Sequence, residues 1–218
     1  ADGSLVQLST DRANNDVDVA VKYIPRDFVM SNQKVVLREV LNHHQMSQYK
    51  HPHLVQLLEV ILTPRYLGLV MEFVDGVSLQ SYLVDSGGML EEDTARFIFQ
   101  QLVLTVEFMH KMGKVNRDIK LENIMVVDNG MPLIKLCNFS LSKDRAADSS
   151  PVTQAGSALF TAPEVLLNVQ GHSYDGEPVD VWSCGVVGVG CRGRERVTHL
   201  GECHVTNASW RMPCHTRL

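Results

Sequence analysis

The amino-acid sequence predicts an α+β fold in which a strand-rich N-terminal part precedes a mainly helical part. Alternating apolar residues within residues 1–24 indicate strands, and apolar residues at helical spacing over residues 91–112 indicate a long helix. A length of 218 residues with 44% hydrophobic residues suits one domain or two tightly joined lobes.

Residues 33–47 are predicted to form a helix. Its apolar stripe would consist of Val36, Leu37, Val40 and Leu41. The helix should end before His51-Pro52-His53, because proline lacks an N–H group and disfavours the helical region in the residue before it. Further strands are expected over residues 54–62, 66–73 and 131–136.

The long helix over residues 91–112 has acidic residues in its first turn and Lys111 near its end, and both favour the helix dipole. Gly113 is expected to stop it. The predicted core positions are Phe97, Ile98, Leu102, Val106 and Met109.

Composition excludes several classes of partner. The net charge of -5 does not favour nucleic acid or an anionic membrane as a partner. No apolar run approaches the ~20 residues of a membrane-spanning helix, and the N-terminus has no signal-like segment. Five cysteines without close pairing suit a reducing compartment. We therefore expect a cytoplasmic or nuclear protein.

The segment Val115–Met125 carries the chemistry on which the functional prediction depends. Asp118 can accept a proton from a hydroxyl, and Lys120 can offset negative charge on a transferred group. Asn123 offers an oxygen to a hard cation such as Mg²⁺. A base, a cation and a metal-binding oxygen are parts that phosphoryl transfer uses.

This segment resembles the catalytic loop of protein kinases, H-R-D-L-x-x-x-N, with Asn116 in place of the histidine. Upstream, Val19–Lys22 resembles the kinase V-A-I-K motif. Downstream, Asn138–Ser140 stands where the family has D-F-G, and Ala162–Glu164 matches A-P-E. The order of these motifs identifies the chain as a member of the protein kinase family. Asp118, Lys120 and Asn123 would be its catalytic residues.

The resemblance implies a two-lobed, kinase-like fold. The N-lobe, with a small antiparallel sheet, would span residues 1–71, the hinge residues 72–76 and a helical, incomplete C-lobe residues 77–189. The helices that complete this lobe in the family would be missing, and their absence would leave the helix around Asp180 uncovered. Residues 190–218 lack lysine but are rich in arginine and cysteine, so we expect an unrelated, disordered tail.

The resemblance also implies an ATP site. Its residues would be Val6, Ala20, Lys22, Glu39, Met71, Glu72, Val74 and Met125. Lys22 would contact the phosphates and pair with Glu39, Met71 would be the gatekeeper, and the backbone of Glu72 and Val74 would bond adenine. Of the family's glycine-rich loop only Gly3 remains, so either the chain begins inside this loop or the loop has diverged.

Asn123 and Asn138 would be the Mg²⁺ ligands, and their neutrality makes metal binding doubtful. In the activation segment, Arg117 would bind a phosphate, Thr153 could receive it, and Ser157 would help to hold the substrate.

Two further residues would be structural anchors. By resemblance these are Glu164 and Asp180, and Asp180 would bond the backbone of the catalytic loop.

Tyr23-Ile24, Glu59–Pro64, Lys120–Asn123 and Asp180–Gly185 most resemble the sucrose-nonfermenting-related kinases of green plants and algae, in the osmotic-stress and abscisic-acid branch. The resemblance implies stress signalling by transfer of the ATP γ-phosphate to Ser/Thr hydroxyls of a protein substrate.

Two departures from the family pattern argue for impaired activity. Asn138 replaces the metal-ligand aspartate, and Asn116 would leave a gap below Phe139. Two alternatives stay open: a pseudokinase that acts as a scaffold or nucleotide-sensing module, and a truncated product without function.

Overall fold

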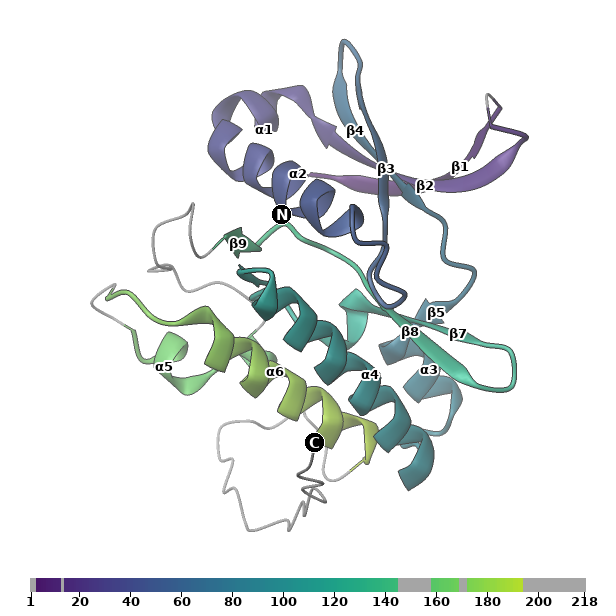
Figure 1. Cartoon of the computed structure of the whole chain (residues 1–218), viewed down its shortest axis with the longest axis vertical. Coiled ribbons are helices and arrows are strands. Elements are labelled where there is room, and N and C mark those ends of the chain that lie inside the picture. Colours follow the sequence, from purple (N-terminus) through teal and green to yellow (C-terminus); the bar gives the residue numbers. More distant parts are fainter. Residues whose placement is uncertain (1–2, 13, 145–157, 169–171, 194–218) are drawn as a thin grey trace.

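The computed structural model describes residues 3–12, 14–144, 158–168 and 172–193. A strand-rich N-terminal part lies above a mainly helical part (Figure 1), so the predicted α+β fold is confirmed. The first part contains β1 (Leu5–Asp11), β2 (Val17–Pro25), α1 (Arg26–Ser31), α2 (Gln33–Ser47), β3 (Leu57–Leu62) and β4 (Tyr66–Glu72). The second part contains β5 (Val77–Ser78), α3 (Leu79–Asp85), α4 (Glu92–Lys111), β6 (Lys114–Val115), η1 (Leu121–Asn123), β7 (Ile124–Asp128), β8 (Pro132–Leu136), β9 (Lys143–Asp144), η2 (Ala158–Phe160), α5 (Pro163–Leu166) and α6 (Gly176–Cys191).

The N-terminal sheet is antiparallel, with strand order β1-β2-β4-β3. Alternation along β2 buries Val19 and Val21 on one face, as the period of a strand requires. Lys22 pairs in register with Val6 of β1 and with Leu69 of β4. The sheet therefore fixes the position of Lys22 from both sides.

Helix α2 has the predicted bounds, but the predicted apolar stripe is wrong for two of its four residues. Leu37 and Leu41 are exposed, with 58% and 48% of their surface accessible. The buried face is largely polar and consists of Val36, Glu39, Asn42, His43, Met46 and Ser47. Its polar side chains can be buried because each has a hydrogen-bond partner; they are Glu39, Asn42, His43 and Ser47.

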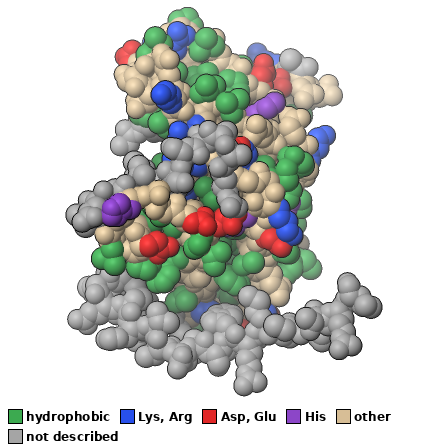
Figure 2. Space-filling model, turned by 60° about the vertical axis from the view of Figure 1, so that its left-hand side comes forward, with side chains coloured by type: hydrophobic (Ala, Val, Ile, Leu, Met, Phe, Trp, Pro, Cys, Tyr) green, Lys and Arg blue, Asp and Glu red, His purple; other side chains and the backbone are tan. Residues whose placement is uncertain are grey.

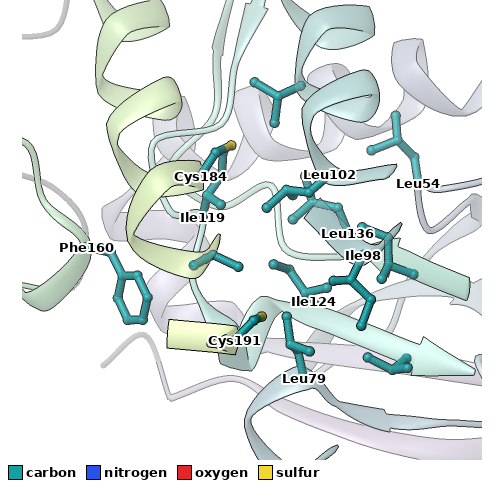
Figure 3. Close-up of a cluster of buried hydrophobic side chains, with 14 of the residues drawn as sticks. Leu54, Leu79, Ile98, Leu102, Ile119, Ile124, Leu136, Phe160, Cys184 and Cys191 are labelled. Atoms are coloured by element: carbon teal, nitrogen blue, oxygen red, sulfur yellow. The ribbon is translucent and has the colours of Figure 1, made fainter. Parts of the chain in front are cut away.

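The core of the second part forms between α4, α6 and the sheet of β7 and β8. The predicted core residues Ile98, Leu102, Val106 and Met109 of α4 are buried, whereas Phe97 is half-buried. Figure 3 shows Ile98 and Leu102 gathered with Leu136 and Ile124 of the sheet and with Cys184 of α6. Gly113 has a φ of 71°, a conformation that glycine adopts readily at a helix C-terminus.

Helix α6 crosses α4 closely at Gly188. A Cβ atom at this position would lie 2.9 Å from the ring of Phe99 on α4, so the side chain has to be absent. The helix continues through Gly190 and Cys191, two residues into the segment that we expected to be an unrelated tail. Cys191 is buried, and its carbonyl accepts a hydrogen bond from Leu90 N at 2.8 Å. Residues 194–218 of that expected tail lie outside the described residues.

The outer side of α6 exposes apolar side chains. Val181, Trp182 and Val189 are 62%, 41% and 47% accessible. On the face shown in Figure 2, hydrophobic side chains also reach the surface in both the upper and the lower part of the molecule. Apolar surface of this kind favours association with other apolar surface.

The compositional predictions concerned the state of the cysteines and the length of the apolar segments. Cys137, Cys184 and Cys191 are free thiols in the described part of the chain. Among the helices in the described ranges, none combines the length and apolar character needed to cross a bilayer.

Candidate active site

The predicted ion pair between Lys22 and Glu39 is present. Strand β2 supplies Lys22 and helix α2 supplies Glu39, and the Nζ and Oε1 atoms lie 2.5 Å apart. Both side chains are largely buried. Because the surroundings exclude most of the water, removal of either partner would leave a buried charge without its counter-ion, which is strongly destabilising.

The other residues predicted to contact ATP come from two sheets. Val6 lies opposite Lys22 on β1, and Ala20 on β2 lies opposite Met71 on β4. Met125 belongs to β7, where it pairs with Ser78 and Lys135. Their contacts with ATP stay a prediction.

The segment between β4 and β5 connects the two parts of the molecule, where the hinge was expected. The amide of Glu72 donates to Gln56 O at 3.0 Å, and the carbonyl of Val74 accepts from Gly76 N at 2.9 Å. A Cβ at Gly76 would lie 2.3 Å from Val126 O, so only glycine fits there. Bonds from Glu72 and Val74 to adenine stay a prediction.

The side chain of Glu72 has a structural role that the sequence did not reveal. Its Oε1 accepts hydrogen bonds from Gln56 N at 3.1 Å and from Lys135 Nζ at 2.6 Å. Lys135 belongs to β8, so this contact joins the N-terminal sheet to the second part of the molecule.

Asp180 of α6 holds the backbone of the catalytic loop, as predicted. Its two carboxylate oxygens accept from Asn116 N at 2.8 Å and from Arg117 N at 2.7 Å. His110 Nε2 of α4 lies 2.9 Å from the same Oδ2 atom as Asn116 N. These bonds support the unusual backbone of Arg117, whose φ is 67°. The sequence did not indicate the role of His110.

The carboxylate of Asp118 is buried at the centre of a polar network. Its Oδ2 accepts from Asn123 Nδ2 at 2.8 Å and from Asn138 Nδ2 at 3.1 Å. Lys120 Nζ lies 3.7 Å from its Oδ1. Burial raises the pKa of Asp118, and the positive charge of Lys120 opposes this effect. A raised pKa makes the carboxylate a stronger proton acceptor.

Asn138 is held by three hydrogen bonds. Besides the bond to Asp118, its Oδ1 accepts from Ser140 N at 3.2 Å and its backbone carbonyl accepts from Asn116 Nδ2 at 3.2 Å. Its φ is 69°, a value that asparagine tolerates better than most residues do.

Asn116 was expected to leave a gap below Phe139. Its side chain is buried and bonded at both ends, because its Oδ1 also accepts from Asp118 N at 3.0 Å, and the gap itself stays a prediction. The ring of Phe139 stacks on His43 of α2, a contact that the sequence did not predict.

The Mg²⁺ ligands that the family implies can be tested against this geometry. Mg²⁺ prefers oxygen ligands, often carboxylates. Here Asn123 and Asn138 both turn their amide N–H groups toward Asp118, and neither carries a charge. The residues present therefore do not fit a Mg²⁺ site of the family's kind.

Arg117 contacts Leu141, the first residue of the predicted activation segment (residues 141–161), and Tyr174, which follows that segment. Its Nη2 donates to the hydroxyl of Tyr174 at 2.7 Å, and its Nη1 donates to Leu141 O at 3.4 Å. Thr153 and Ser157 lie outside the described residues. Glu164 is exposed in the first turn of α5, so its predicted anchoring role stays a prediction.

The charges of Asp118 and Lys22 both affect the pKa of the Cys137 thiol. Cys137 directly precedes Asn138, and its pKa is raised to about 11, chiefly by burial. The negative charge of Asp118 raises this pKa further and the positive charge of Lys22 lowers it, so both groups lie close enough to affect Cys137.

Comparison with known proteins gives the same assignment. The model of the protein kinase domain matches residues 3–199. The chain is 41% identical over 182 residues to the serine/threonine-protein kinases SAPK9 of Oryza sativa subsp. japonica and SRK2D of Arabidopsis thaliana. Each alignment covers 84% of this chain and 48% of the relative, so the chain spans about half the length of these curated relatives. The predicted resemblance to sucrose-nonfermenting-related kinases is confirmed, and the chain belongs to the protein kinase family.

Proposed function

We propose that this chain is a serine/threonine protein kinase domain that binds ATP and transfers its γ-phosphate slowly. The observation that carries this proposal is the buried Lys22–Glu39 pair, which holds a cation on β2 at the position of the family's phosphate-binding lysine. Its relatives are named serine/threonine-protein kinases.

In this proposal Lys22 contacts the phosphates of ATP, and Glu39 keeps its ammonium in place. Asp118 accepts the proton of the substrate hydroxyl, for which its raised pKa suits it. Lys120 lies 3.7 Å from Asp118 and offsets negative charge on the transferred phosphoryl group. Mg²⁺ would ordinarily neutralise part of that charge in this family.

Slow transfer follows from the hydrogen bonds around Asp118. Its Oδ2 already accepts from the amides of Asn123 and Asn138. The bond from Asn123 lowers the pKa of Asp118 and so opposes the rise that burial causes, which limits the gain in basicity. The two amides also bring no charge that could fix a cation between the phosphates.

The test is incorporation of phosphate from labelled ATP into a mixture of Ser- and Thr-containing peptides. The parent chain should exceed an Asp118→Asn control, which keeps the shape of the side chain but removes the base. Lys22→Met should reduce incorporation by weakening ATP binding. Equal incorporation by the parent and the Asp118→Asn control would refute slow transferase activity.

A pseudokinase that senses nucleotide or acts as a scaffold is the second candidate, favoured by the bond from Asn138 to Asp118. It predicts that ATP raises the melting temperature although no phosphate is transferred. A truncated product without function predicts neither effect and no cooperative melt.

The cellular setting is part of the proposal. The similarity to the osmotic-stress and abscisic-acid branch supports a role in stress signalling with a protein substrate. The free thiols of Cys137, Cys184 and Cys191 support a reducing compartment, either the cytoplasm or the nucleus.

A further inference from the structure

The amide group of Asn138 reaches the same oxygen of Asp118 as the amide group of Asn123. The two Nδ2 atoms lie 3.1 Å and 2.8 Å from Oδ2. We propose that these two amides replace the divalent cation of this site, so that the chain binds a nucleoside di- or triphosphate equally well without Mg²⁺. This inference rests on the proposed function, because it concerns the same nucleotide.

The orientation of Asn138 is fixed from its other end. Its Oδ1 accepts from Ser140 N at 3.2 Å. If the side-chain amide were reversed, Oδ1 would face the carboxylate of Asp118 and Nδ2 would face the Ser140 amide. Both contacts would be repulsive, so the network selects the orientation that points N–H groups at Asp118.

These N–H groups oppose a cation at Asp118. An amide hydrogen carries partial positive charge, and two of them already point at Oδ2. A Mg²⁺ ion held by Asn123 and Asn138, the ligands that the family implies, would have to compete with Ser140 N for Oδ1 of Asn138 and lose part of its own hydration, which it gives up reluctantly. Because the side chains of Asn123 and Asn138 are neutral, they offer no negative charge that would offset the loss of hydration.

The same network would fail with a carboxylate in place of Asn138. An aspartate there would put two negatively charged groups at hydrogen-bond distance, and only a cation or a proton could hold them together. Asn138→Asp should therefore convert a site that is indifferent to metal into one that depends on metal. Asn129→Asp is the matched control, since it makes the same charge change at an exposed residue of the β7–β8 turn.

The experiment is calorimetric titration of the whole chain with ADP and with ATP, once in EDTA and once in excess Mg²⁺. For the parent and for Asn129→Asp we expect dissociation constants that agree within about threefold between the two conditions, a small difference in free energy. For Asn138→Asp we expect Mg²⁺ to tighten binding by about ten- to hundredfold, as a contact with a charged group does.

The parent measurement decides the inference even if Asn138→Asp does not fold, which a thermal melt will reveal. Tightening by Mg²⁺ of about tenfold or more in the parent would overturn the inference and leave the proposed ATP-dependent function intact. Failure of the parent to bind either nucleotide under either condition would overturn both. A folded Asn138→Asp variant that stays indifferent to Mg²⁺ would also overturn the role assigned to the Asn138 amide.

Discussion

The imidazole ring of His43 stacks on the phenyl ring of Phe139, with centroids 4.4 Å apart and planes inclined by 23°. His43 Nε2 donates to Val55 O at 2.8 Å, so the ring is fixed at its outer end as well. Ser142 Oγ accepts from Asn42 Nδ2 and donates to Phe139 O. Helix α2 therefore holds the segment after Asn138 through neighbouring polar and aromatic contacts.

The burial of His43 gives the first prediction, a loss of stability in acid. Burial lowers the pKa of His43 from 6.5 to about 4, the bond to Val55 opposes this, and the charge of Lys22 adds to it. Between these two values the unfolded chain binds a proton that the folded chain does not. The part of the free energy of unfolding that depends on a neutral His43 is thus fully present above pH 6.5. It falls as the pH drops toward 4, by at most about 3 kcal/mol.

Urea unfolding between neutral pH and about pH 4.5 measures this loss against a His43→Leu variant, which keeps an apolar side chain against Phe139 and cannot take up a proton in this range. Other titrating groups affect both proteins, so the difference between the two curves isolates His43. Parallel curves would show that His43 does not carry the acid sensitivity.

The second prediction concerns Asp180. Asp180→Ala would leave the buried amides of Asn116 and Arg117 without their acceptor, at a cost of about 1–3 kcal/mol for each. His110→Leu removes a single side-chain partner of Asp180 and should cost only about 1 kcal/mol. Denaturant unfolding gives both values, and equal losses would mean that the backbone bonds are not the important ones.

The third prediction compares two glycines on α6. Gly188→Ala would press a methyl group against Phe99 and should destabilise the fold by about 1 kcal/mol or more. Gly185 is exposed with open space where a Cβ would lie, so Gly185→Ala should stabilise the helix by about 1 kcal/mol. Thermal melts of both variants should shift in opposite directions, and a shift in the same direction would contradict the close crossing of α4 and α6.

The fourth prediction is that Asn138→Asp raises nucleotide affinity in Mg²⁺ more than it raises turnover. A contact with a charged group is worth about 1.5–3 kcal/mol, or one to two decades in affinity. Turnover also requires the phosphates to be held in line and a substrate to be docked, which one carboxylate does not provide.

Affinity and peptide phosphorylation are measured on the same preparations of both forms, with Asn129→Asp as the control for charge. A variant that reached the ~1–100 s⁻¹ typical of kinases would show that Asn138 alone limits activity.

The sequence predicted those parts of the fold that depend on local periodicity. The bounds of α2 and the buried positions of α4 follow from apolar spacing and from breakers such as Gly113. The bonds of Asp180 were predicted through the family resemblance, because the family implies both the residue at this position and the backbone atoms that it bonds.

Tertiary contacts explain what the sequence did not predict. In α2 the exposed residues Leu37 and Leu41 are more apolar than the buried Asn42 and His43, so hydrophobicity misplaced two of the four stripe residues. The partners that make those polar residues favourable inside lie far along the chain, such as Ser142 for Asn42. Strand β7 was missed because it directly follows the catalytic loop without a turn signal between them.

The bonds from Asp180 to the amides of Asn116 and Arg117 also set how fast those two N–H groups can exchange with solvent. Each hydrogen is held by a carboxylate on α6 and not by a neighbouring strand or turn, so it is released when the loop and α6 separate. Their deuterium uptake therefore reports how often this polar loop separates from the apolar helix α6.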